Sequence, residues 1–303
     1  MQLPLSSPKI EYLSQEDWLE LHFAKDHVSA SQVSSILNYN KWCNGYTLWA
    51  QKAGIFPWSK ESFLMTLGHF AEEPIAKKYE KETGRTCTDY GDFAIIRHPE
   101  YPWLFATLDR EAERHGGEKG AIEIKLSTQT GSWNEVERGP LMYQIQNQIQ
   151  MHCGGYSWGA LVGQIGRTYD QYHAYEFERD DAFFDWMIPK IKEFRYQCMN
   201  NIEPEAKEYF EQYASIVKIL HPEDSGKTIE LSPEQVECAR AYTIANAQIK
   251  ELKRQQDGHK FRIQREMKDA SFGDCGDSGI VKWVTRRDGT RVMTIKVATP
   301  EGE

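Results

Sequence analysis

Apolar residues recur at helical spacing along the N-terminal part of the chain. Residues 28–54 predict two short helices around a polar loop, with Ser31 placed to cap the first of them. Residues 62–83 carry one apolar stripe and predict a helix that ends at the C-cap residue Gly84. Pro74 lies inside that stretch and lacks an amide hydrogen, so we expect a kink or a fresh helix start there.

The middle of the chain changes to the short apolar runs and alternation of strands. Residues 93–98, 103–113 and 120–127 predict three strands in a meander, because glycine and proline separate them. Residues 158–166 and 169–179 predict another strand pair.

Two further helices flank that strand pair. Residues 140–154 have helical period between Pro140 and Gly154, and residues 180–199 form an amphipathic stretch led by two acids. The order of helices, meander, helix, hairpin and helix predicts an α+β fold around a mixed sheet.

The composition shifts after Pro204. Residues 232–268 predict a helical hairpin broken near Gly258, and the following segment predicts a β-hairpin that turns at Asp288–Gly289. We therefore expect a core over residues 1–205 and a C-terminal extension over 206–303, whose basic helix and edge-capable hairpin suit binding of a partner, with a solvated helical hairpin as the plain alternative.

Composition narrows the class of protein. The chain has 303 residues, 40% of them hydrophobic and 27% charged, and we expect a folded protein that stays in the cytoplasm. Its 6 cysteines form no CxxC pair, which disfavours structural zinc, an iron–sulfur cluster and a disulfide framework. The net charge of −9 argues against a uniformly basic nucleic-acid binder, although residues 245–303 carry 12 basic and 9 acidic residues.

The sharpest local pattern is Asp109, thirteen residues, and then Glu123-Ile124-Lys125. In a strand, Glu123 and Lys125 project from the same face, and a hairpin turn would bring Asp109 opposite Glu123. Two carboxylates beside a lysine would bind a hard divalent cation, and the lysine would orient or deprotonate an attacking water. The ordinary alternative is a strand with Glu and Lys on its solvated face.

Two helical features add to this pattern. Glu72 lies near the apolar stripe of its helix, so its carboxylate is a candidate to point inward, although a surface acid is the plain alternative. Gln146, Gln148 and Gln150 give the helix over 140–154 an unusual glutamine density. Such glutamines either orient a buried site or form a polar helix face.

These segments, taken in order over residues 27–205, resemble the YqaJ-type phage recombinases related to lambda exonuclease, in the PD-(D/E)xK nuclease superfamily. The similar segments are residues 28–54, 68–84, 106–110, 120–127, 143–155 and 178–194. One departure is Leu108-Asp109-Arg110, which stands where the family usually has Pro-Asp-Gly.

The resemblance implies a restriction-endonuclease-like α+β fold and a metal-dependent 5′-to-3′ exonuclease that leaves 3′ overhangs on duplex DNA. Asp109, Glu123 and the Ile124 carbonyl would bind Mg²⁺, with Mn²⁺ as a substitute, and Lys125 would serve the attacking water. Glu72 would assist the second metal position or the water network, and Gln146 would orient the site. Ser29 and Ser31 would help to receive the 5′ phosphate, although plain helix capping is the favoured explanation for hydroxyls there.

The resemblance also implies a trimeric or tetrameric ring, a single-strand annealing protein as partner, and a phage or prophage origin in the bacterial cytoplasm. Two other functions stay open at this point: an endonuclease of the same superfamily, and a noncatalytic DNA-binding module on the same fold.

Overall fold

The computed structural model describes residues 9–60, 62–114, 116–127, 133, 138–166, 171–205, 216–219 and 221–298. It divides into two compact units, Met1–Asp224 and Ser225–Glu303, which we describe separately. The boundary predicted from the sequence, between residues 205 and 206, lies before the division between the two units at 224/225. The first residues of the predicted extension, 206–215, lie outside the described residues.

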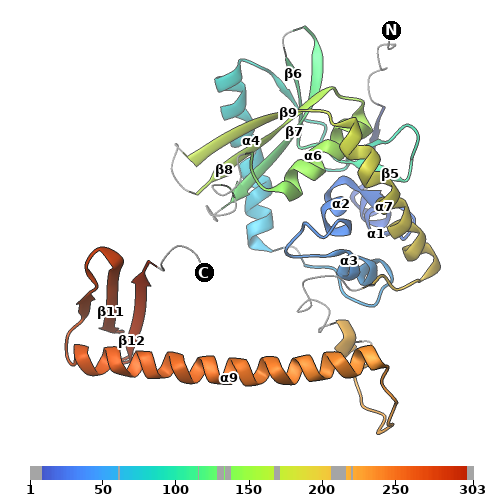
Figure 1. Cartoon of the computed structure of the whole chain (residues 1–303). Helices are drawn as coiled ribbons and strands as arrows, with labels where there is room; N and C mark the ends of the chain where they lie inside the picture. The colour runs from blue at the N-terminus through green and yellow to red at the C-terminus, as the bar shows by residue number, and fades with distance from the viewer. Residues whose placement is uncertain are drawn as a thin grey trace. The chain divides into compact units, whose positions relative to one another are not determined.

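A mixed five-stranded sheet forms the centre of the first unit, in the order β3-β6-β7-β8-β9 (Figure 1). Its strands are β3 (Cys87–Thr88), β6 (Arg110–Arg114), β7 (Glu118–Ser127), β8 (Trp158–Ile165) and β9 (Tyr172–Glu178). The β7–β8 pair is parallel and the other pairs are antiparallel. The predicted antiparallel pairing of residues 158–166 with 169–179 is confirmed.

Helices cover both faces of this sheet, so β7 is buried on both sides. On one face, Ile122 and Ile124 pack against Ile75 and Tyr79 of α4 (Phe63–Thr83). On the other, Ala121 joins a core cluster that includes Ile145 and Ile149 of α6 (Leu141–Gly154). The predicted α+β class, with a central mixed sheet between helices, is confirmed.

A second sheet of four strands has the order β1-β4-β5-β2. Its strands are β1 (Ile10–Tyr12), β4 (Ala94–Arg97), β5 (Leu104–Ala106) and β2 (Val28–Ser29). The predicted strand over 103–113 is therefore wrong as a single element, because it divides into β5 and β6 in different sheets. Thr107 lies at the break, where its carbonyl and hydroxyl accept hydrogen bonds from side chains instead of a neighbouring strand.

Helices α4 and α6 lie close to the predicted ranges, as do α2 (Ala30–Ile36), α3 (Gly45–Lys52) and α7 (Asp181–Asn200). Helix α1 (Gln15–Phe23) also belongs to this unit and was not predicted. The predicted C-cap of α4 is confirmed, since Gly84 has a φ of 72° that suits glycine. The helix runs through Pro74 as one element, so no fresh start occurs there.

The second unit contains one long helix, α9 (Pro233–Met267), and a small sheet in the order β10-β11-β12. The predicted helical hairpin is wrong, because the strong helix formers one turn away on both sides of Gly258, such as Lys253, Gln255 and Arg262, outweigh its cost of about 1 kcal/mol. The predicted β-hairpin is confirmed as β11 (Gly279–Thr285) and β12 (Arg291–Val297), which β10 (Phe272–Asp274) extends. Within the described ranges, every helix is too short or too polar to cross a bilayer.

Candidate active site

The register of β6 and β7 brings Asp109 to the middle of β7. Arg110 is paired with Ile122, so Asp109, one residue before β6 begins, stands beside Glu123. Its Oδ2 accepts a hydrogen bond of 2.7 Å from the Ile124 amide. Because the amide and carbonyl of one strand residue point to the same side, the Ile124 carbonyl also faces the edge that β6 leaves open.

Lys125 joins the two carboxylates. Its ammonium contacts Glu123 Oε1 and lies 3.7 Å from Asp109 Oδ2, while the Tyr143 ring of α6 lies 5.5 Å from it. Burial opposes the charge on Lys125, but the Glu123 and Asp109 carboxylates outweigh that cost and raise its pKa well above the usual value. The lysine is therefore protonated at neutral pH.

Glu123 is fully buried and is held from two sides. Burial raises its pKa above the usual range, the nearby Asp109 carboxylate adds to this, and Lys125 and Gln150 oppose it. Gln150 Nε2 donates to Glu123 Oε2 at 2.6 Å and to the Thr107 carbonyl at 3.1 Å. One buried amide of α6 thus fixes both the acid and the chain just before Asp109.

Gly159 allows α6 to approach the sheet this closely. A Cβ at Gly159 would lie 2.5 Å from Asn147 Oδ1 and 2.8 Å from the Ala121 carbonyl. Asn147 Nδ2 in turn donates to the Ala121 carbonyl at 3.0 Å and to Gln150 Oε1 at 3.1 Å. These bonds fix the orientation of the Gln150 amide, so its NH₂ group points at the carboxylate.

The glutamines of α6 have different positions from those expected. Gln150, and not Gln146, is the glutamine that contacts Glu123. Gln146 is partly exposed on the same helix face, between Tyr143 and Gln150, and its role stays a prediction. Gln148 faces away from the site, where it donates to the Glu178 carbonyl and accepts from the Asp180 amide.

Glu72 approaches the same charges from α4. Its side chain is 19% exposed, and Oε1 lies 3.1 Å from His69 Nδ1. Burial raises the pKa of Glu72 to about 7, with repulsion from Asp109 adding to the shift and Lys125 opposing it. The neighbouring Glu73 is 59% exposed and pairs with Arg110 instead. Of the two adjacent acids, Glu72 is therefore the one that shares the electrostatic environment of the site.

The two serines have a structural role in the N-terminal segment. Ser29, and not the predicted Ser31, is the N-cap of α2, and its amide donates to Gln32 Oε1 in a capping box. Ser29 is buried, with its Oγ 3.1 Å from that of the exposed Ser31. Ser29 pairs with Phe105 of β5, the strand that leads to Asp109. Contact of these serines with a 5′ phosphate stays a prediction.

The donor set fits a hard divalent cation. Asp109, Glu123 and the Ile124 carbonyl offer oxygens on one side of β7, with Glu72 nearby. Among the described residues, no three His, Cys, Asp or Glu side chains already form a metal-binding group, and Lys125 occupies the space between two of the carboxylates. Burial first, and repulsion from Asp109 second, raise the pKa of Glu72 and of Glu123, and a bound cation would oppose both effects.

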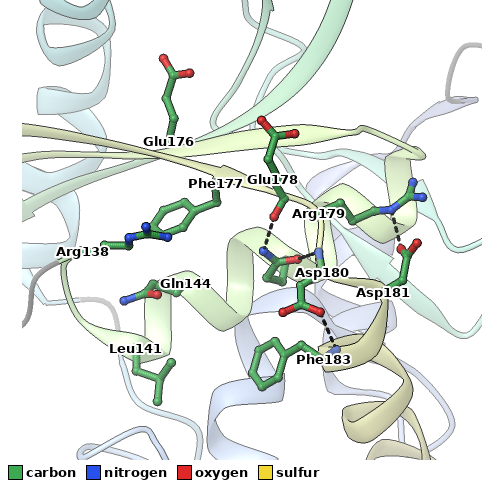
Figure 2. A pocket seen from close by; sticks show the side chains of 11 residues that line it. Arg138, Leu141, Gln144, Glu176, Phe177, Glu178, Arg179, Asp180, Asp181 and Phe183 are labelled. Carbon is green, nitrogen blue, oxygen red and sulfur yellow. Dashed lines mark hydrogen bonds and ion pairs between the residues drawn. The ribbon is translucent and has the colours of Figure 1, made fainter.

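A separate pocket of about 600 Å³ is lined by the face of α6 that carries Gln144 and Gln148, away from Gln150 and the candidate site (Figure 2). It is lined by Arg138, Leu141, Gln144, Gln148, Glu176, Phe177, Glu178, Arg179, Asp180, Asp181 and Phe183. Its charged groups are largely paired with one another or with the sheet, as Arg179 is with Asp181 at 2.8 Å and Glu178 is with Arg114 at 2.9 Å. This pocket contains none of the predicted site residues.

Comparison with known proteins confirms the family resemblance. Residues 17–157 match the family described as the YqaJ-like viral recombinase domain. A curated relative, the uncharacterized protein YqaJ of Bacillus subtilis (strain 168), is 28% identical over 271 residues, which span 88% of this chain and 82% of the relative.

Two solved structures are also similar. The alkaline exonuclease LHK-Exo from Laribacter hongkongensis is 26% identical with a TM-score of 0.47, over 67% of this chain and 100% of that one. A phage related exonuclease from Haemophilus somnus 129PT is 15% identical with a TM-score of 0.42, over 63% and 96%. Both scores are below 0.5, so neither likeness carries weight for function.

Proposed function

Because residues 17–157 carry a YqaJ-like viral recombinase domain, we propose that this protein is a Mg²⁺-dependent exonuclease acting on duplex DNA. It degrades one strand from the 5′ end and leaves 3′ single-stranded overhangs for phage-type recombination. The observation that carries the proposal is the convergence of Asp109, Glu123 and Lys125 where β6 begins. Two carboxylates can hold a metal ion for phosphodiester hydrolysis, and an ammonium beside them can stabilise the charge that develops on the phosphate.

The residues of the site have separate roles in this proposal. Mg²⁺ held by Asp109, Glu123 and the Ile124 carbonyl would act as a Lewis acid, and Mn²⁺ would substitute for it. Lys125, protonated because two carboxylates raise its pKa, orients the attacking water and neutralises charge that develops on the phosphate. Glu72 and Gln146 complete the hydrogen-bond network around that water. Gln150 keeps Glu123 aimed at the open edge of β7.

The remaining partners follow from the family resemblance. The protein assembles as a trimer or tetramer ring around DNA and acts beside a single-strand annealing protein. The second unit contacts DNA or a neighbouring subunit, which suits the net charge of +3 that residues 245–303 carry in a chain of net charge −9.

The test is digestion of linear duplex DNA, with or without a 5′ phosphate, beside closed circular DNA in Mg²⁺ or EDTA. We expect Mg²⁺-dependent loss of 5′-phosphorylated linear DNA only. Glu123→Gln and Lys125→Ala should abolish it, whereas Glu118→Gln, an exposed acid on the same strand, should not.

The competing functions give different results in the same assay. Cutting of circles would favour an endonuclease, because an endonuclease needs no DNA end. Binding of duplex DNA without cleavage under any metal condition would favour a noncatalytic module and would contradict the proposal.

A further inference from the structure

Arg110 has an unusual set of partners for a residue that directly follows a candidate metal ligand. Its side chain is only 8% exposed. Nη2 lies 2.9 Å from Glu73 Oε2, and Nη1 lies 3.1 Å from Asp89 Oδ2. Nη1 also donates to the carbonyl of Asp109 at 2.5 Å. One guanidinium therefore contacts α4, the segment between β3 and β4, and the backbone of Asp109.

Arg110 is the partner that joins these two carboxylates. Glu73 and Asp89 are 59% and 53% exposed, and their other contacts are local: Glu73 lies 3.7 Å from Lys77 one turn along α4, and Asp89 accepts a hydrogen bond of 2.7 Å from the Gly91 amide. A guanidinium is planar and presents several donors in a fixed fork, which a lysine ammonium does not reproduce. Arg110 is thus suited to hold two acids and a carbonyl in one arrangement.

This contact lies where α4 is otherwise weakly held. The buried residues of α4 are Ile75, Ala76 and Tyr79, all in its C-terminal part. In its first two turns, Phe63 and Phe70 are 80% and 76% exposed. Glu72 lies at the boundary between the exposed and the buried part, and the Arg110–Glu73 pair is the ion pair that ties this turn to β6.

We propose that Arg110 is a positioning residue that sets Glu72 against Asp109 by linking α4 to the start of β6. The inference rests on the proposed function, since it assigns Glu72 and Asp109 to one metal-dependent site. Arg110 touches neither substrate nor metal. It acts through Glu73 on α4 and through the Asp109 carbonyl on β6.

The test compares Arg110→Gln with Arg114→Gln. Arg114 is a matched control, because it also lies on β6 and also pairs with two acids, Glu118 at 2.8 Å and Glu178 at 2.9 Å, but at the far end of the strand. We expect Arg110→Gln to lower kcat for 5′-phosphorylated duplex by about tenfold or more while KM changes less than about twofold. Arg114→Gln should leave both values within about twofold.

Two readouts do not depend on turnover. Calorimetric titration with Mn²⁺ should show affinity about tenfold weaker in Arg110→Gln than in wild type or Arg114→Gln. Amide hydrogen exchange over residues 68–76 should become faster in Arg110→Gln only. Glu73→Gln should reproduce these effects from an exposed position, and the double variant should be no worse than Arg110→Gln alone.

Equal behaviour of the two arginine variants, or additive losses in the double variant, would overturn the inference. If Arg110→Gln fails to fold, Glu73→Gln decides the question. If wild-type protein binds Mn²⁺ but degrades no DNA, the proposed function fails, while metal affinity and amide exchange still test the positioning role.

Discussion

Replacing Gln150 with leucine should both destabilise the protein and misplace Glu123. The Gln150 amide is fully buried and donates to Glu123 Oε2 and to the Thr107 carbonyl. Leucine has a similar volume and cannot hydrogen-bond, so both acceptors would lose this donor inside the core.

The magnitude follows chiefly from these two donated bonds, because Asn147 Nδ2, which donates to Gln150 Oε1, also has the Ala121 carbonyl as an acceptor. Losing a hydrogen bond to a charged acceptor costs roughly 1.5–3 kcal/mol, and losing one to a buried carbonyl costs about 1 kcal/mol. Apolar burial of the leucine side chain offsets part of this, so we expect a net loss of about 2–3 kcal/mol. Gln146→Leu, at a partly exposed position one turn earlier, should change stability by about 0.5 kcal/mol or less.

Urea unfolding followed by tryptophan fluorescence would measure both variants, and DNA digestion would measure kcat. Gln150→Leu should also lower kcat by about tenfold or more, because Glu123 loses the donor that orients it. Equal stability loss in the two variants, or a Gln150→Leu protein as stable and active as wild type, would refute the reasoning.

Three further predictions test other parts of the structure. Lys52, buried in α3, donates to the carbonyls of His22, Ala24 and His27. Lys52→Met should therefore lower the free energy of unfolding, measured by urea titration, by roughly 2–4 kcal/mol. A change below about 0.5 kcal/mol would contradict this. Because the folded-state pKa of Glu72 is raised from 4.5 to about 7, the folded protein binds more protons between those values, and the contribution of Glu72 to stability falls as pH rises from about 4.5 to 7. In EDTA, Glu72→Gln should remove this pH dependence and raise the free energy of unfolding above pH 7 by up to about 3 kcal/mol. Thermal melts from pH 4 to pH 8 would measure this, and a melting temperature that changes with pH equally in wild type and variant would contradict it. Mn²⁺ at about 100 times its Kd should stabilise wild type by about 2.7 kcal/mol in calorimetric melts, and the same gain in Asp109→Asn would exclude Asp109 as a ligand.

Much of the local structure follows from the sequence alone. Period-3.6 stripes with caps at Ser62 and Gly84 define α4, because capping and amphipathic spacing are local properties. The two-residue spacing of Glu123 and Lys125 puts both on one face of β7, and the antiparallel turn after β6 brings Asp109 opposite them. The candidate site of these three residues was therefore predictable from period, turn and spacing.

Some local patterns are compatible with two structures, and other residues of the protein decide between them. Gly258 is compatible with either a break or a continuous helix, and α9 is continuous because its flanking residues favour helix. The pattern over 103–113 predicts one strand, but hydrogen bonds from the distant Gln150 and Trp18 side chains to Thr107 divide it into strands of two sheets.

Tertiary structure alone decided which side chains complete the site. Gln146 and Gln150 lie on the same face of α6, and the close packing of that helix against Gly159 places Gln150 on Glu123. Arg110 contacts Glu73 and Asp89, which lie distant in the sequence, so no local pattern indicates these ion pairs. The sequence determines period, caps and same-face neighbours because these depend on adjacent backbone geometry. The position of one helix along a distant strand depends on the packing of the whole core, and a difference of one turn changes which side chain reaches the carboxylate.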